Sequence, residues 1–319
     1  MSIFSSVSSQ DQVDFTKSLA IMLKSGIPID NALSELAEQS DSPHFAKVIS
    51  RIRVDVENGT SLSNAFGKET KSFGAIFVSL IRAGEDSGTL QGNLQFLADW
   101  LTRSTDLKRE IAAATMYPKL VFGAAMLLGG SLAVFILPKL VPLFTSLDVE
   151  LPWITETLLA ISLWVQSYWL LALFGVVAVF VFLIYLNTFF RVRKVFHIIY
   201  INIPFMGTLL KNYQRALITQ LFATLLKSGL SLNESVNIVS QAATNIPYQE
   251  SLKVIHGNVL KGITLSKSMK HFNKLFPNMM ISIVEVGENS GSLVQSLDYL
   301  AEFYTKEVNS LTKKLPTII

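Results

Sequence analysis

The chain of 319 residues contains no cysteine. Disulfide bonds, thiolate metal sites and cysteine nucleophiles are therefore excluded. Charge is also scarce, because charged residues make up only 16% of the chain, whereas hydrophobic residues make up 50% and the mean hydropathy is +0.41. This composition is typical of a membrane protein.

Motifs that carry chemistry are missing as well. The four histidines are isolated, with no His-x-x-x-His pair that would indicate a zinc site. Gly67-Lys68 is followed by Glu69 where a phosphate-binding loop needs Ser or Thr. No Gly-x-Ser-x-Gly motif is present. We therefore expect no catalytic residue, no metal and no cofactor.

Three motifs recur at one constant spacing of 203 positions. The pairs begin at Leu23 and Leu226, at Asn58 and Lys261, and at Gly84 and Gly287. Because one offset serves all three pairs, the chain is expected to be a duplicated polar domain with an insert between the two copies.

The insert contains two long stretches without charge. The first lies between Lys119 and Lys139 and the second within 157–190. Each is long enough to cross a bilayer, which needs ~20 residues. The second membrane helix is expected at about Tyr168–Phe189, preceded at 153–165 by an amphipathic helix or by an extension of the same helix.

The charges that flank these stretches predict the orientation. Basic residues precede the first stretch and follow the second, whereas the loop between them carries more acidic residues than basic ones. Lys and Arg are disfavoured in short translocated loops. Both copies are therefore expected in the cytoplasm and the loop outside. The second copy is the more basic, which favours an anionic lipid surface or an acidic protein as its partner. Nucleic acid is not expected, because the lysines lack interleaved aromatic residues.

Within both copies the apolar spacing is helical, and no alternating strand pattern is convincing. The expected fold is all-α, with about six helices in each cytoplasmic bundle. The expected organisation is a first bundle at 1–117, a transmembrane hairpin at 118–190 with an outer loop at about 139–156, a basic linker and leading helix at 191–214, and a second bundle at 215–312.

The sharpest local motif is Gly-Glu-Asp/Asn-Ser-Gly, at Gly84, Glu85, Asp86, Ser87 and Gly88 and again at Gly287, Glu288, Asn289, Ser290 and Gly291. The first glycine of each is expected to close a helix and the serine to cap the next one. The two glutamates permit a structural turn, an interhelical hydrogen bond, a partner contact or a hard-cation site. Further turns are expected at Gly26, Gly229, Gly59 and Gly262.

Three small residues, Ala125, Gly129 and Ala133, lie four apart in the first apolar stretch. This spacing favours close packing against another helix, within the chain or in a partner, and plain variation on a lipid-facing helix is the alternative. Neither expected span contains a charged residue, which argues against an ion pathway.

Four motifs occur together in this chain: the pattern Phe15-x₃-Leu19-Ala20-x₂-Leu23-x₂-Gly26, the two Gly-Glu-x-Ser-Gly turns, Tyr117-Pro118, and the run from Pro138-Lys139-Leu140 to Glu150-Leu151-Pro152. As a set they resemble the F-type inner-membrane platform proteins of type II secretion and type IV pilus machines. The resemblance covers almost the whole chain, including Ile203-Pro204-Phe205-Met206-Gly207.

The resemblance implies a non-enzymatic scaffold in the bacterial inner membrane that associates with itself. Its partners would be a hexameric assembly ATPase, a pilin or pseudopilin, other inner-membrane assembly proteins and the lipid bilayer. The glycines and glutamates of the two turns would be structural or contact residues, and charge reversal at Glu85 and Glu288 would abolish assembly in a folded protein.

The family also has a third membrane helix after the second copy. Residues 313–319 are therefore expected to be its start, unless the helix is missing. A small transporter or channel subunit is the alternative function. It is disfavoured because the repeat lies in the polar domains and not in the spans.

Overall fold

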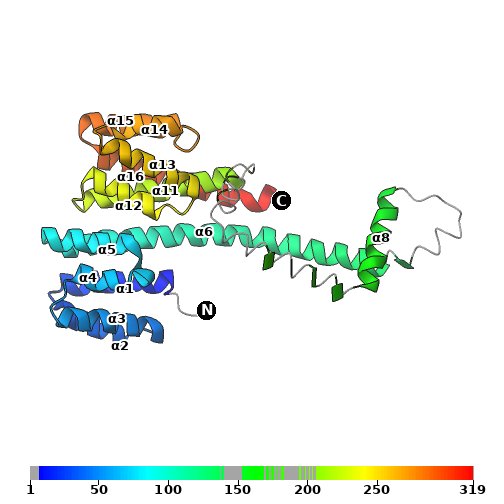
Figure 1. Cartoon of the computed structure of the whole chain (residues 1–319), viewed down its shortest axis with the longest axis horizontal. Helices are drawn as coiled ribbons and strands as arrows, with labels where there is room; N and C mark the ends of the chain where they lie inside the picture. The colour runs from blue at the N-terminus through cyan, green and yellow to red at the C-terminus, as the bar shows by residue number, and fades with distance from the viewer. Residues whose placement is uncertain are drawn as a thin grey trace. The chain divides into compact units, whose positions relative to one another are not determined.

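The computed structural model describes residues 7–136, 138–139, 153–168 and 206–318, together with scattered positions between 170 and 203. These residues are almost wholly helical and include no strand (Figure 1). The prediction of an all-α fold is confirmed.

The first copy consists of six helices, which are α1 (Ser9–Lys24), α2 (Ile29–Glu38), α3 (Pro43–Glu57), α4 (Leu62–Lys68), α5 (Thr70–Ser87) and α6 (Leu90–Ser131). Its core is a cluster of phenylalanines from four of these helices, with ring centroids 4.6 to 6.4 Å apart: Phe15, Phe45, Phe66, Phe73 and Phe77. Truncating one such buried ring to alanine costs about 3–5 kcal/mol. The aromatic cluster therefore holds α1, α3, α4 and α5 together.

The second copy consists of α11 (Met206–Lys227), α12 (Leu232–Ala242), α13 (Ile246–Val259), α14 (Leu265–Met269) with a short 3₁₀ helix (Lys270–Phe272), α15 (Asn278–Ser290) and α16 (Leu293–Ile318). Four of its helices, α12, α13, α14 and α16, begin 203 positions after α2, α3, α4 and α6. The turn glycines keep the same offset, so the spacing found in the sequence is a spacing of helices and turns.

The core of the second copy is more polar than that of the first. Tyr248 is fully buried, and its hydroxyl donates to the carbonyl of Leu275 at 3.1 Å. Arg215 Nε donates to the same carbonyl at 2.8 Å, and its guanidinium lies 5.6 Å from the ring centre of Tyr304. Burial raises the pKa of Tyr248 to about 12, since a phenolate would lose its hydration there.

The prediction that Gly84 and Gly287 close a helix is wrong. Both lie inside helices, and α5 and α15 continue to Ser87 and Ser290. The helices end one residue later, at Gly88 and Gly291, whose φ angles are 68° and 70°. This left-handed conformation costs an L-residue about 1–2 kcal/mol and costs glycine little.

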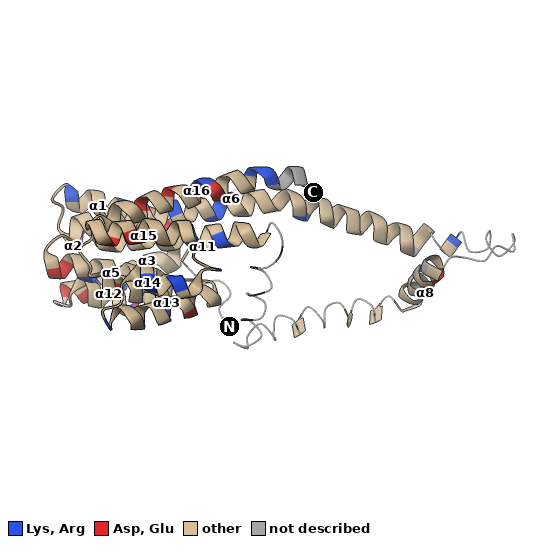
Figure 2. Ribbon diagram, turned by 90° about the horizontal axis from the view of Figure 1, so that it is seen from above, with Lys and Arg blue, Asp and Glu red and all other residues tan. Residues whose placement is uncertain are grey.

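Helix α6 runs 42 residues and changes character along its length. Its first part is buried in the first copy through residues such as Leu94, Leu97 and Leu101. Beyond Lys119 it exposes apolar side chains such as Phe122, Met126 and Leu127, and this part contains no charged residue and is tan ribbon in Figure 2. Among the described residues, α6 is the one helix long and apolar enough to cross a membrane. A π-helical turn (Leu132–Ile136) follows it.

The rest of the expected hairpin is described only in part. Helix α8 spans Trp153–Ser167, where the sequence predicts a helix leading into the second span. Most of the expected outer loop at 139–156 and of the second span at Tyr168–Phe189 lies outside the described residues. The pairing of two membrane helices therefore stays a prediction.

The chain forms two compact units. One contains residues 1–111 and 197–311, and the other contains residues 112–196 and 312–319. Apart from the C-terminal parts of α6 and α16, both copies thus belong to the first unit, in which α5 contacts α12. The expected boundary at 117/118 falls inside the continuous helix α6, and the expected linker at 191–214 overlaps the start of α11. The domain limits stay a prediction.

Candidate functional site in the paired glutamate turns

Each glutamate of the two turns binds the start of another helix. The carboxylate of Glu85 accepts hydrogen bonds from the backbone amides of Leu62 at 2.5 Å and Ser63 at 2.9 Å. Glu288 accepts from Leu265 at 2.6 Å and from Ser266 at 2.9 Å. The first amides of a helix have no partner within that helix, so each glutamate caps the short helix α4 or α14 from outside.

These caps combine hydrogen bonding with electrostatics. A carboxylate is favoured at the positive N-terminal end of a helix by about 0.3–1 kcal/mol. Hydrogen bonds to a charged group add about 1.5–3 kcal/mol. The side chain of Ser61, at the N-cap of α4, makes no capping hydrogen bond, whereas Thr264 accepts from the amide of Lys267 at 3.4 Å. The glutamate is therefore the main side-chain cap of α4.

The first glycine of each turn allows two helices to approach closely. A Cβ on Gly84 would lie 2.7 Å from Cα of Leu90, and one on Gly287 would lie 2.5 Å from Oγ of Ser296. Such distances require the neighbouring helix to move. Gly84 and Gly287 are thus packing residues that bring α5 against α6 and α15 against α16.

The serines do not cap the following helices as the sequence predicts. Ser87 Oγ donates to the carbonyl of Ala83 at 2.5 Å, and Ser290 Oγ donates to that of Val286 at 2.7 Å. Each serine therefore bonds back to its own helix. The turn itself is closed by an amide of the residue after the second glycine, for example from Thr89 to the carbonyl of Gly84 at 2.9 Å.

Asp86 and Asn289 are exposed, as are the serine and the second glycine of each turn. The neighbouring glutamates are half-buried and hydrogen-bonded, so charge reversal at Glu85 or Glu288 perturbs the fold as well as the surface. A partner would reach Asp86 on the first copy and the uncharged Asn289 on the second. Whether either turn binds a partner stays a prediction.

The remaining turn glycines share one geometry. Gly26, Gly229, Gly59 and Gly262 have φ angles of 81°, 86°, 81° and 78°. After each, the next amide closes the turn, as from Ile27 to the carbonyl of Met22 at 3.0 Å. Glycine at these four positions therefore ends helices and contributes no side-chain chemistry.

On α6, the residues Ala125 and Gly129 are exposed, and a Cβ on Gly129 would meet no atom within 4 Å. Ala133 follows in the π-helical turn. The described part of the chain thus leaves space beside Gly129 for another helix, and the predicted packing stays a prediction.

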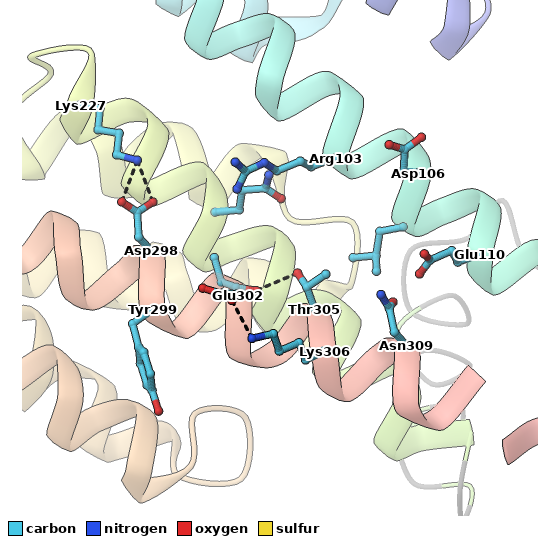
Figure 3. A pocket seen from close by; sticks show the side chains of 13 residues that line it. Arg103, Asp106, Glu110, Lys227, Asp298, Tyr299, Glu302, Thr305, Lys306 and Asn309 are labelled. Atoms are coloured by element: carbon cyan, nitrogen blue, oxygen red, sulfur yellow. Dashed lines mark hydrogen bonds and ion pairs between the residues drawn. The ribbon is translucent and has the colours of Figure 1, made fainter. Parts of the chain in front are cut away.

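A cavity of about 800 Å³ lies between α6, α11 and α16 (Figure 3). Lys227 pairs with Asp298 at 2.7 Å, and Lys306 pairs with Glu302 at 2.7 Å. The hydrogen bond from Lys306 lowers the pKa of Glu302, and the charge of Arg103 acts in the same direction. Because these charges are already paired along the cavity wall, we assign it no ligand.

No group of three or more potential metal-ligating side chains is found among the described residues. The sequence permits an interhelical hydrogen bond for the glutamates, but it does not indicate their partners at the starts of α4 and α14. The available signal was the separation of 22 and 23 positions between each glutamate and those amides, which is the same in both copies.

Comparison with known proteins places these features in one family. The family described as type II secretion system, protein F, matches residues 15–138 and 218–316. The chain is 31% identical over 311 residues to the type IV pilus assembly protein PilC of Thermus thermophilus, covering 97% of this chain and 76% of the relative.

Two further relatives agree. Identity is 31% over 300 residues to the type II secretion system protein F of Xanthomonas campestris, covering 92% of this chain and 73% of the relative. It is 28% over 306 residues to PilC of Pseudomonas aeruginosa, covering 96% and 82%. The chain therefore belongs to the type II secretion system protein F family, whose curated relatives include type IV pilus assembly proteins.

Proposed function

We propose that this chain is the inner-membrane platform of a type IV pilus or type II secretion machine. In this proposal, both copies lie in the cytoplasm and engage a hexameric assembly ATPase. The membrane helices contact pilin or pseudopilin subunits as these enter the filament. The chain performs no catalysis itself and transmits movement from the ATPase to the subunits.

Helix α6 is the observation that carries this proposal. One continuous helix contains residues buried in the first copy and residues apolar enough for a bilayer. At 1.5 Å per residue, a helix of this length spans about 63 Å. A displacement of the first copy is therefore transmitted along α6 without passing through a flexible loop.

Softening α6 without changing its length tests the proposal. Ala112, Ala113 and Ala114 lie between the buried and the apolar parts of the helix, and Ala112 and Ala113 are exposed. Replacing all three by glycine costs about 1 kcal/mol of helix propensity per residue. We expect at least a tenfold loss of filaments or secreted substrate, while the variant still co-purifies with the assembly ATPase.

Replacing the same three alanines by glutamine provides the matched control, because glutamine is a good helix former. This variant should assemble filaments at close to the unmodified level. Normal assembly by the glycine variant would contradict coupling through α6. Failure of the unmodified chain to co-purify with the ATPase would contradict the proposed partner.

A further inference from the structure

The two copies contain the same groove, and only one of the two is filled. In the second copy a cavity of about 30 Å³ lies between α11 and the end of α12, and Trp100 of the first copy forms one of its walls. In the first copy a cavity of about 160 Å³ lies at the equivalent place, between α1, the end of α2 and α3.

The two grooves are lined by equivalent residues of the two copies. Apart from Trp100, every residue lining the groove of the second copy has its counterpart, 203 positions earlier, in the lining of the first. Ile218 and Val239 correspond to Phe15 and Leu36, for example. The larger groove is therefore equivalent to the smaller one, except that no tryptophan from another copy closes it.

The residue that would fill the open groove is present on the second copy. Trp100 lies on α6, and its counterpart 203 positions later is Phe303 on α16. Phe303 is half-buried, and its ring centre lies 5.2 Å from that of Tyr304. The open groove is lined only by residues of the first copy, so Phe303 of the same chain does not fill it.

The contact between the copies within one chain is therefore one-directional. Helix α5 of the first copy contacts α12 of the second. The counterpart surface on α15 stays open, with Met279 41% exposed and Val286 63% exposed. A one-directional contact uses a different surface on each partner and leaves one copy of each surface free. The free surfaces are the groove of the first copy and the α15–α16 face of the second.

The charges of the two free surfaces are complementary. Three aspartates, Asp11, Asp14 and Asp41, line the open groove, where the filled groove has the uncharged Gln214, Leu217 and Thr244. Asp11 caps the amide of Ser8, Asp14 accepts from Gln10, and Asp41 is exposed.

A lysine of the second copy is placed to pair with these aspartates. Lys71 lines the same cavity as Trp100 and Thr244. Its counterpart on the second copy is Lys274, which is exposed, and the counterpart of Thr244 in the open groove is Asp41. Within the chain, Lys71 lies near Thr244. The equivalent contact between the two free surfaces would bring Lys274 near Asp41.

We propose that the open groove of the first copy receives Phe303 and the α15–α16 face of the second copy of another molecule of the same chain. The contact repeats the one already made within each chain, with added pairing of Lys274 to the aspartates. The surfaces differ, so the association is head to tail and adds protomers in one direction until a ring closes. This proposal is independent of the coupling proposed for α6.

The absence of cysteine makes the contact directly testable by cross-linking. Gln39 corresponds to Ala242, and Met279 corresponds to Ile76, which lines a cavity with Ala242. Two full-length chains with different tags, one Gln39→Cys and the other Met279→Cys, are co-expressed, and the membranes are oxidised. We expect a cross-linked dimer that carries both tags, at a level at least tenfold above that of any cross-linked dimer in cells that express either variant alone.

Charge and shape variants of the same pair sharpen the test. Asp41→Lys in the Gln39→Cys chain should lower the yield of mixed dimer about tenfold, and Lys274→Asp in the other chain should restore it. Phe303→Asp should lower the yield, whereas Val254→Asp, at a residue 52% exposed on α13 of the same copy, should leave it unchanged.

Three results would overturn the proposal. The first is no mixed dimer although both thiols react with maleimide. The second is dimers formed equally well by either variant alone, which indicates a symmetric contact. The third is cross-linking of the Gln39→Cys chain to a different protein in place of the tagged partner. Filament assembly is not part of this measurement, so its failure and failure of the proposed function are distinguishable.

Discussion

Glu85 and Glu288 show how one side chain stabilises a turn and a distant helix together. Each lies near the end of a long helix and accepts hydrogen bonds from two backbone amides at the start of a short helix. Four amides lack partners at every helix start, and a helix of only a few residues has little other stability. The carboxylate therefore fixes α4 or α14 in place.

Glu288→Ala should destabilise α14 locally by about 1–3 kcal/mol, because two amides lose a charged acceptor. Hydrogen exchange in the full-length protein measures this through faster exchange of the amides of Leu265 and Ser266. Asn289→Ala, at the neighbouring exposed residue, should leave these rates almost unchanged. Unchanged exchange in Glu288→Ala would show that the cap is dispensable.

Tyr248 should make stability sensitive to alkaline pH. Its pKa is raised by burial to about 12, against about 10 for an exposed tyrosine. The protonated phenol is favoured in the folded state, so its contribution is complete below pH ~10 and is lost as pH rises through about 12. The shift corresponds to about 3 kcal/mol.

Absorbance of tyrosinate, followed together with unfolding, checks this prediction. The full-length protein should lose stability above pH ~10, and Tyr248→Phe should have a flatter dependence because it cannot ionise. Equal pH dependence in both proteins would show that Tyr248 does not control alkaline unfolding.

At the scale of helices, Gly84 fixes the distance between α5 and α6. A methyl group there would lie 2.7 Å from backbone, whereas one on Gly92, which is exposed on α6, meets no atom within 4 Å. Gly84→Ala should destabilise the first copy by about 1–3 kcal/mol through forced separation of the helices. Gly92→Ala should instead stabilise it by about 0.4–1 kcal/mol.

Chemical denaturation of the full-length protein compares these two variants under the same conditions. Opposite signs for the two alanines would identify close helix packing as the reason for glycine at position 84. Equal effects would mean that the same change in backbone entropy accounts for both substitutions and that close packing at position 84 contributes nothing.

Helix positions were largely predictable from sequence, because periodicity and turn glycines report local structure. Pro28 indicates the start of α2 correctly, and Gly26 and Gly229 end helices as predicted. The chain turns where predicted, but the helices end at Gly88 and Gly291, so Glu85 and Glu288 lie inside helices and Gly84 was misread as a helix end. A glycine that permits close approach and one that ends a helix look alike in sequence, and only the neighbouring helix distinguishes them.

At the scale of the whole molecule, the constant offset predicted equivalent helices but not their unequal use. The groove of the first copy depends on where Trp100 lies relative to α12, which no local pattern encodes. The positions equivalent to Gln214, Leu217 and Thr244 are aspartates in the first copy, and this difference in charge is visible in the sequence. That these aspartates line an open groove is apparent only once both grooves are located in the structure.

The phenylalanine cluster of the first copy also bears on how the protein is made. Its five rings lie between residues 15 and 77, all before the apolar part of α6. Domains generally fold as units from the N-terminal end during synthesis. The first copy can therefore acquire its core while the ribosome is still translating the membrane segment, so the insertion machinery receives an apolar helix attached to a bundle that is already folded.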